Sequence, residues 1–533
     1  MSEDNRIPIA VGVTGHRAIR GEDEAAIFAA VRAELEKLRA KCPSSPLVLL
    51  TSLAEGADLL CADAAEALGI PLWAALPTAR EEYEKDFSDA AKARLAHHCA
   101  RAERVFVTPY TEAVPADGPN RDFRFRQAGI YVASHCHVLL ALWDGGEGTA
   151  AACGTAEAVD FALRGSYLPA NGAVSCTGRA AVIHIFTPRG ARTGCEAGTV
   201  RALGDEDALR DGLAKTDEFN HLVLRETANP SSALPAHEPN DALLERMDHV
   251  RAYAGRISRF NAGRYRSVLA ALALSGSLFA AFFLLYDTAG LSGMILGCGC
   301  LLAVTAGILR YAARAACHRR YLEYRALAEC LRVALYLRYA GSAVQVSDLL
   351  TWTQREETAW IARALAVLEA GPPAAEKHDI REYWVDVQRK YHAAAGKRSA
   401  RERTLSDCVI RTALIGSIIL YCAVLAFELL CGGAICRPLL PVAEAETYRM
   451  VLKLALGLLS VVTVLIAGYY GNLSLPRALS DHRKLEHFYE KTSEMLAQFG
   501  QMDALLVQIA REELIENGNW CSYQQDNTPD ISL

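Results

Sequence analysis

Four long apolar stretches constrain this chain more than any other feature of its sequence. They are residues 267–286, 291–309, 409–430 and 450–470. The first two contain no charged side chain, and the other two contain only Arg411, Glu428 and Lys453. A helix of about twenty residues is long enough to cross the hydrocarbon core of a bilayer. The sequence therefore predicts four membrane spans, the alternative being buried helices of a soluble protein.

The flanks of these stretches predict their orientation. The stretches form two hairpins, since only "DTAG" separates the first from the second. Basic segments flank each hairpin: "RISRFNAGRYR", "RYAARAACHRRY", "KRSARERT" and "RALSDHRK". Short loops rich in Lys and Arg remain on the cytoplasmic side. We therefore expect both termini and residues 312–404 to be cytoplasmic, with Cys431 and Cys436 on the oxidising side, where a disulfide is left open.

Composition excludes several classes of protein. A chain of 533 residues is too long for one ordinary domain, and a hydrophobic content of 51% fits a membrane protein. The net charge of -6 provides no basic field for nucleic acid. The sixteen cysteines show no zinc-site spacing, so we interpret them as reduced thiols and expect neither a metal nor a cofactor. The N-terminus "MSEDNRIPIA" lacks the apolar core of a signal peptide.

The region before the first span alternates short apolar runs with helical patterns. The runs are "IPIAVGV", "PLVLLTS", "PLWAALP", "RVFVTP", "CHVLLALWDG" and "AAVIHIFTP". This alternation predicts an α/β fold, a doubly wound parallel sheet of Rossmann-like type, followed by an all-α membrane domain. We expect three parts: a ligand-binding domain over 1–190, a linker and lever helix over 191–265, and a membrane region over 266–533 with cytoplasmic helices at 312–404 and 476–516.

Polar residues follow several of these strands, where open α/β sheets bind their ligands. The candidate ligand-binding residues are Gly12, Thr14, Gly15, His16, Arg17, Ser52, Glu55, Gly56, Asp58, Arg80, Tyr83, Arg126, Trp143, Asp144, Gly154, Thr155 and Glu157. Glycines allow close approach of the backbone to a phosphate, and hydroxyls and arginines donate to it. Carboxylates such as Asp58 accept bonds from ribose hydroxyls. Taken singly, each motif also fits a purely structural role. For Arg126 the sequence leaves two roles open, a phosphate contact and pairing with neighbouring acids on the surface.

As a set, these motifs resemble a known family. The segments "GVTGHR", "LAEGADLLCADAA", "LPTAREEYEKDF", "YVASHCHVLLALWDG" and "GTAEAV" look like the SLOG superfamily over about residues 7–189. That resemblance implies a pocket for a nucleotide-derived ligand, with relatives of ADP-ribose prominent. Hydrolytic members carry Pro-Gly-Gly-x-Gly-Thr-x-x-Glu. Here "ACGTAEAV" lacks the Pro-Gly-Gly and its glutamate comes one residue early, which turns the carboxylate by about 100° on a helix and argues against hydrolysis.

The membrane half has a resemblance of its own. The segments "YRALAECLRVALYLRYAG", "REYWVDVQRKYH" and "EELIENGNWC" look like the SLATT group of bacterial membrane effectors, over about residues 237–521. The combination implies an inner-membrane protein that senses a nucleotide second messenger and opens or disrupts the membrane in antiviral defence. Its expected partners are the ligand, the bilayer, further copies of the chain and a signal-producing enzyme encoded nearby.

Two other functions stay open at this point. A membrane-anchored nucleotide or nucleoside hydrolase would use Glu157, or Glu55 with Asp58, as general acid or base, although an anchor requires only one span. A transporter would need polar groups at mid-membrane, whereas Glu428 and Lys453 lie near the outer ends and can pair with each other. For the sensing effector, we expect residues 220–266, as the covalent route from sheet to membrane, to transmit ligand binding as a rigid lever.

Overall fold

The computed structural model divides the chain into two compact units. Unit 1 contains Met1–Ile257, Glu323–Ile380 and Gln501–Ser522, and unit 2 contains Ser258–Leu322, Arg381–Gly500 and Tyr523–Leu533. Within them, the structure describes residues 5–146, 154–164, 166–167, 175–176, 180–189, 195–226, 241–374, 376–430, 441–472 and 475–526.

The core of unit 1 is a seven-stranded sheet with the order β4-β3-β2-β1-β5-β8-β9. Its strands are β1 (Ile9–Gly15), β2 (Leu47–Thr51), β3 (Leu72–Leu76), β4 (Arg104–Val107), β5 (Val138–Trp143), β8 (Ala181–Phe186) and β9 (Val200–Leu203). All neighbours pair in parallel except β9, which pairs antiparallel with β8 at the edge. The predicted α/β class is therefore confirmed, and each of the six predicted apolar runs overlaps one of the parallel strands. A separate two-stranded ladder joins β6 (Ser166–Tyr167) to β7 (Ser175–Cys176).

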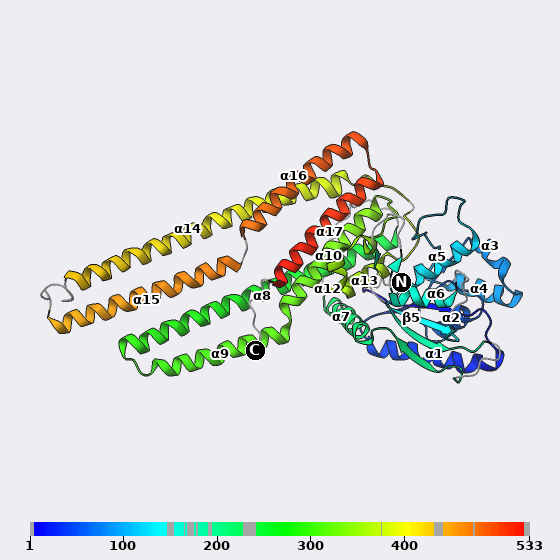
Figure 1. Cartoon of the computed structure of the whole chain (residues 1–533), viewed down its shortest axis with the longest axis horizontal. Helices are drawn as coiled ribbons and strands as arrows, with labels where there is room; N and C mark the ends of the chain where they lie inside the picture. Colours follow the sequence, from blue (N-terminus) through cyan, green and yellow to red (C-terminus); the bar gives the residue numbers. More distant parts are fainter. Residues whose placement is uncertain are drawn as a thin grey trace. The chain divides into compact units, whose positions relative to one another are not determined.

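Helices cover both faces of this sheet, as its nearly continuous apolar strands require. One face packs against α1 (Gly21–Lys41), α2 (Ala57–Ala67) and α4 (Asp89–Arg101). The other face packs against α5 (Arg121–Ser134), α6 (Thr155–Arg164) and α13 (Ala359–Glu369). In Figure 1, α1 and α6 lie on opposite sides of β5. The short helix α3 (Arg80–Tyr83) follows β3.

A helical layer from later in the chain belongs to the same unit. It contains α7 (Glu206–Leu224), α11 (Val346–Leu349), α12 (Trp352–Glu357), α13 and most of α10 (Cys317–Tyr339) and α17 (Asp503–Asp526). Phe219 of α7 contacts Tyr324 of α10, with ring centroids 5.4 Å apart. Asn517 of α17 donates to the carbonyl of Ala326 over 3.3 Å. Residues 323–380 and 501–522, which the sequence grouped with the membrane region, thus pack with the sheet.

Unit 2 contains two helical hairpins. The first pairs α8 (Ala242–Ala289) with α9 (Met294–Ala315), and the second pairs α14 (Asp386–Leu430) with α15 (Val442–Asn472), followed by α16 (Leu475–Phe499) (Figure 1). The π-helical turn Arg381–Val385 precedes α14. The continuous helix α8 confirms the prediction of a helix that runs directly into the first span. Cys431 and Cys436 lie outside the described residues.

Four helices in the described chain are long and apolar enough to span a membrane. At most 11% of the residues in their most apolar windows are buried. Helices in the core of a soluble protein would be covered by other side chains, so these faces fit a lipid environment better. Glu428 on α14 accepts two hydrogen bonds from Arg449 on α15, at 2.6 and 2.9 Å. Glu428 thus pairs with Arg449, which lies one helical turn before the expected partner, Lys453.

The chain crosses between the two units more often than the sequence indicated. Besides α8, the helices α10 and α17 also run across the boundary. The expectation that residues 220–266 form the only covalent connection was therefore wrong, because it assigned the whole of 312–404 to the membrane side.

Candidate functional site

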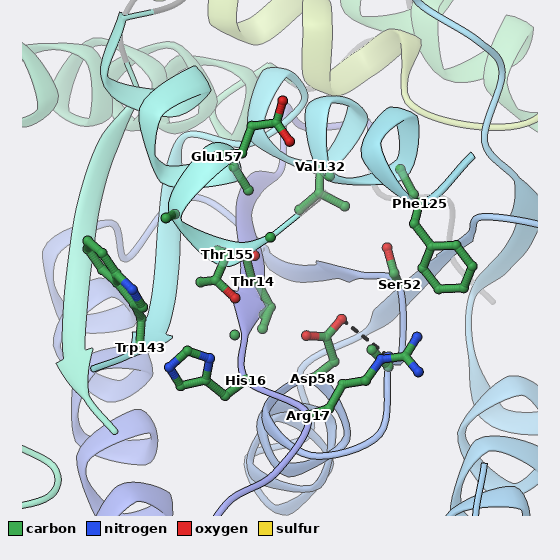
Figure 2. Close-up of a pocket in the computed structure, with 18 of the residues that line it drawn as sticks. Thr14, His16, Arg17, Ser52, Asp58, Phe125, Val132, Trp143, Thr155 and Glu157 are labelled. Carbon is green, nitrogen blue, oxygen red and sulfur yellow. Dashed lines mark hydrogen bonds between the residues drawn. The ribbon is translucent and has the colours of Figure 1, made fainter. Parts of the chain in front are cut away.

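The strand order places a crevice between β1 and β5. The chain proceeds from β1 to β2, β3 and β4 on one side, and then returns to the other side of β1 with β5. Loops that leave β1 and β5 therefore diverge at their carboxyl ends, where open α/β sheets bind ligands. A pocket of about 550 Å³ lies here in the structure (Figure 2).

Most of the predicted site residues line this pocket. They are Thr14, Gly15, His16, Arg17, Ser52, Asp58, Tyr83, Arg126, Trp143, Asp144, Gly154, Thr155 and Glu157. The carboxyl ends of β1, β2 and β5 bring most of them together because parallel strands end at the same edge of the sheet, while Tyr83 lies on α3 and Arg126 on α5.

Gly12, Glu55, Gly56 and Arg80 are the predicted residues that do not line the pocket. A Cβ on Gly12 would lie 2.8 Å from the Cys136 sulfur, so this glycine allows close packing at the end of α5. Glu55 accepts a 2.6 Å hydrogen bond from the Ser88 hydroxyl near the start of α4. Arg80 forms an ion pair with Glu84, one turn later in the chain.

Gly56 joins two loops of the site to each other. Its φ of +93° lies in a region that residues with a Cβ rarely adopt. A Cβ at this position would lie 2.1 Å from the carbonyl oxygen of Arg17, and the amide of Ala57 donates to the carbonyl of His16 over 3.0 Å. Gly56 therefore allows the start of α2 to pack directly against the loop after β1, and it does not line the pocket.

Asp58 is a buried carboxyl group at the edge of the pocket. It lies in the first turn of α2 and accepts hydrogen bonds from the Thr51 hydroxyl at 2.9 Å and the Ala54 amide at 3.3 Å. Burial raises the pKa of Asp58 to about 6, although these bonds and the charge of Arg17 act in the opposite direction. This group therefore titrates near neutral pH, and it can accept a bond from a ligand or exchange a proton with it.

Near Asp58, two polar groups lack the polar partner expected for them among the described residues: an arginine without an ion pair and a hydroxyl without a hydrogen bond. Arg17 is exposed, contacts the face of the Phe125 ring at 5.3 Å and forms no ion pair with a described carboxylate. The Tyr83 hydroxyl is buried without a hydrogen-bond partner among the described residues. Burial also raises the pKa of Tyr83, so its hydroxyl is a neutral donor. A buried hydroxyl without a partner is costly, and a ligand in this pocket would supply one.

The opposite side of the pocket contains His16 and Trp143 (Figure 2), and Asp144 follows Trp143 in the chain. The His16 Nε2 accepts a hydrogen bond from the Asp144 amide at 3.2 Å, which places the ring proton on Nδ1. Burial lowers the pKa of His16, against the opposing effect of Asp144. His16 is therefore a neutral imidazole at physiological pH, and it positions the loop after β5.

Arg126 is held by carboxylates of the protein. Its Nε lies 2.7 Å from Glu157, and its Nη1 forms an ion pair with Glu112. Figure 2 shows Glu157 pointing away from His16 and Asp58. Arg126 thus bridges α5 and α6, as in the alternative that the sequence left open, in which it pairs with neighbouring acids, and its side chain still lines the pocket.

Two helix N-termini border the pocket. The helix α2 begins at Ala57 and α6 begins at Thr155, whose first amides have no acceptor within their own helix. The helix dipole favours anionic groups at such ends, although the first amide of α2, that of Ala57, already donates to the His16 carbonyl. Residues 147–153, which precede α6 and include part of "ACGTAEAV", lie outside the described residues.

Among the lining residues that sequence reasoning missed are Phe125, Phe161 and Arg189. Arg189 follows β8, so the rule that found Arg17 also applies to it. The two phenylalanines lie on α5 and α6 and had no such signal. With Trp143, they provide ring surfaces beside the polar groups, an arrangement suited to a ligand that carries an aromatic base as well as anionic groups.

One group of described residues has metal-ligand spacing, and it lies outside the pocket. It consists of Glu66 on α2 with His97 and His98 on α4. Arg101 already lies 2.8 Å from the Glu66 carboxylate, and His98 bonds to Asp63 at 2.7 Å. These pairs satisfy the cluster as a surface ion-pair network.

The chain was compared with models of protein families and with curated proteins, and neither comparison finds a match. The case for a function therefore rests on the pocket and on the membrane helices.

Proposed function

We propose that this protein is a membrane effector whose α/β pocket binds a nucleotide-derived ligand and thereby controls the membrane helices. The observation that carries the proposal is the group formed by Arg17, Asp58 and Tyr83. An arginine without an ion pair, a buried carboxyl and a hydroxyl without a partner, each judged against the described residues, lie together beside the N-terminus of α2. Phosphate and ribose groups provide the complementary acceptors and donors.

The helix α5 supports a link between ligand binding and the rest of the chain. It contributes Phe125 and Gly129 to the pocket. Near its end, the Tyr131 hydroxyl accepts a 2.9 Å hydrogen bond from the Gly371 amide, and His135 bonds to Gln345 at 2.8 Å. A shift of α5 on ligand binding would therefore act on the helical layer of unit 1, from which α10 continues into unit 2.

The proposed location, signal and biological role come from the sequence resemblances. We place the protein in the inner membrane of a bacterium, with both termini cytoplasmic and with further copies of the chain as partners. An ADP-ribose-type or cyclic nucleotide would be the signal, and membrane opening would serve antiviral defence. Labelling of a cysteine introduced at Arg403 with an impermeant reagent in intact cells tests the orientation, since a cytoplasmic residue stays unlabelled.

A thermal-shift panel on the full-length protein in detergent tests the ligand class. The panel contains ADP-ribose, its cyclic isomers and cyclic oligonucleotides. A compound that binds the folded state raises the melting temperature in a concentration-dependent manner. The proposal predicts that one of them does so in the wild type and requires higher concentrations in Arg17→Gln. If no compound raises the melting temperature, the proposed ligand class is wrong.

A membrane-anchored hydrolase is the second candidate, and Asp58 is the observation that favours it. A carboxyl with a pKa near 6 in a pocket is suited to general acid or base chemistry. Incubation of the wild type with the compound that binds would then yield cleavage products, and Asp58→Asn would yield none. If the protein is a sensor, the compound is recovered intact after incubation with the wild type and with Asp58→Asn.

A further inference from the structure

Two adjoining hollows lie along the first hairpin of unit 2, between α8 and α9. Their volumes are about 590 and 350 Å³, and both include Arg264 and Tyr311. We refer to them together as the hairpin groove. Its floor is apolar and contains Val268, Ala271 and Ile308. Neither hollow belongs to the ligand pocket of unit 1, and a role for the hairpin groove does not depend on the function proposed for that pocket.

Two glycines keep the hairpin groove open. A Cβ placed on Gly263 of α8 or on Gly307 of α9 would meet no other heavy atom within 4 Å. These positions therefore border empty space, in contrast to Gly297 on the same hairpin, where a Cβ would lie 2.4 Å from the Phe282 ring. The two helices pack closely at Gly297 and leave a hollow at Gly263 and Gly307.

The rim of the hairpin groove is cationic. Its arginines are Arg259, Arg264, Arg310 and Arg314. None of the four forms an ion pair with a carboxylate of the described chain. Four guanidinium groups without counter-charges repel one another, so an anion at this place is favoured.

Two aromatic residues hold one of these arginines in position. The Arg264 guanidinium lies 5.7 Å from the centre of the Phe260 ring and 5.5 Å from that of Tyr311, and it also donates to the Tyr311 hydroxyl. Both rings are largely uncovered, with exposed fractions of 64% for Phe260 and 50% for Tyr311. Exposed rings beside arginines are typical of the level at which a bilayer meets water.

The predicted ends of the spans coincide with the hairpin groove. The first span begins at Ser267 and the second ends at Leu309, while the lining residues come from 259–271 and 307–315. The arginines thus lie on the aqueous side of this level, and the apolar floor extends toward the hydrocarbon side.

We propose that the hairpin groove binds an anionic phospholipid, with the headgroup phosphate on Arg264 and Arg310 and an acyl chain along Val268, Ala271 and Ile308. Arginine forms strong paired bonds with phosphate oxygens, and basic pockets between membrane helices suit anionic headgroups. A free phosphate would use the rim but would gain nothing from the apolar floor. A phospholipid uses both.

The test measures lipid selectivity of the full-length protein by native mass spectrometry. The protein is reconstituted in nanodiscs of phosphatidylcholine mixed with phosphatidylglycerol in equal amounts, and retained lipids are counted. The wild type should retain phosphatidylglycerol in preference. The double variant Arg264→Gln with Arg310→Gln should lose this preference by roughly tenfold or more, since each basic residue near a membrane contributes on the order of 1 kcal/mol.

A steric variant tests the hairpin groove without changing its charge. Gly307→Leu fills the hollow and should reduce phosphatidylglycerol retention, whereas Gly299→Leu, on the same helix and also facing open space, should leave it unchanged. If both leucine variants retain the lipid as the wild type does, the apolar floor plays no part and the proposal fails.

Two further outcomes would overturn the assignment. The control pair Arg403→Gln with Arg411→Gln removes the same charge from α14 in the other hairpin. An equal loss in this control would show that general surface charge attracts the lipid. Displacement of the retained phosphatidylglycerol by millimolar inorganic phosphate would show that the rim is a site for free anions.

Discussion

The pocket of unit 1 and the hairpin groove of unit 2 both contain arginines without carboxylate partners among the described residues, but their surroundings differ. Arg17 in the pocket lies beside a buried carboxyl, a buried hydroxyl and a helix N-terminus. Arg264 in the hairpin groove lies beside exposed rings and an apolar floor. An arginine is therefore part of a polar ligand site in unit 1 and of a site suited to an amphipathic ligand in unit 2.

The two sites also differ in how their shape is maintained. Gly56 at the pocket is pressed against the backbone of Arg17, whereas Gly307 at the hairpin groove faces open space. A site fixed by backbone contacts is preorganised for one ligand, and a site left open between helices accommodates a fluid one. Substitutions at the pocket should therefore have large and residue-specific effects.

The largest effect is expected for Gly56→Ala. Its Cβ would clash with the Arg17 carbonyl, and its φ of +93° is strained for alanine, so we expect a loss of about 3–5 kcal/mol of stability. Gly69→Ala is the control, because its φ is +64° but its Cβ meets open space, and it should cost only about 1–2 kcal/mol. Thermal unfolding of the full-length variants measures both. Similar melting temperatures would contradict the role of Gly56 in joining the two loops.

The next effect is a pH dependence that comes from Asp58. Burial raises its pKa from 3.8 to about 6, so the folded chain binds this proton more tightly than the unfolded chain does. The resulting stabilisation is complete below about pH 4 and is lost as the pH rises through about 6, which amounts to about 3 kcal/mol. Asp58→Asn removes this loss.

We therefore expect the melting temperature of Asp58→Asn to rise relative to that of the wild type between about pH 4 and pH 7.5. The exposed Asp89, changed to Asn, should show no such trend. A difference between wild type and Asp58→Asn that does not vary with pH would mean that Asp58 is not buried as described.

A smaller effect separates two arginines of the pocket. Arg17→Gln removes a charge that forms no ion pair with a described carboxylate, so the affinity for the compound found in the panel should fall about tenfold to hundredfold. Arg126→Gln breaks the bridge between Glu112 and Glu157, and it should lower the melting temperature with little change in affinity. Isothermal titration of both variants distinguishes the two roles. Equal losses of affinity in the two variants would mean that Arg126 also contacts the ligand.

Sequence patterns predicted the parts of the molecule that local chemistry determines. Apolar runs identified the parallel strands and the four long apolar helices, and the common edge of those strands brought Thr14, Ser52 and Trp143 together. Patterns did not predict contacts between distant segments. Val367 and Ala370 belong to the sheet's core, yet an amphipathic helix does not specify the surface that it will cover. The sequence left open that Arg126 pairs with neighbouring acids, but it did not identify Glu112 and Glu157 as the partners.

The central claim is that ligand binding in unit 1 opens the membrane, and dye release from liposomes tests it most directly. Full-length protein is reconstituted in liposomes loaded with a fluorescent dye, and the compound identified in the thermal-shift panel is added. We predict no release before addition, rapid release afterwards, and a shift of about tenfold or more in the required concentration for Arg17→Gln. Release without the compound, or release that Arg17→Gln leaves unchanged, would contradict the account.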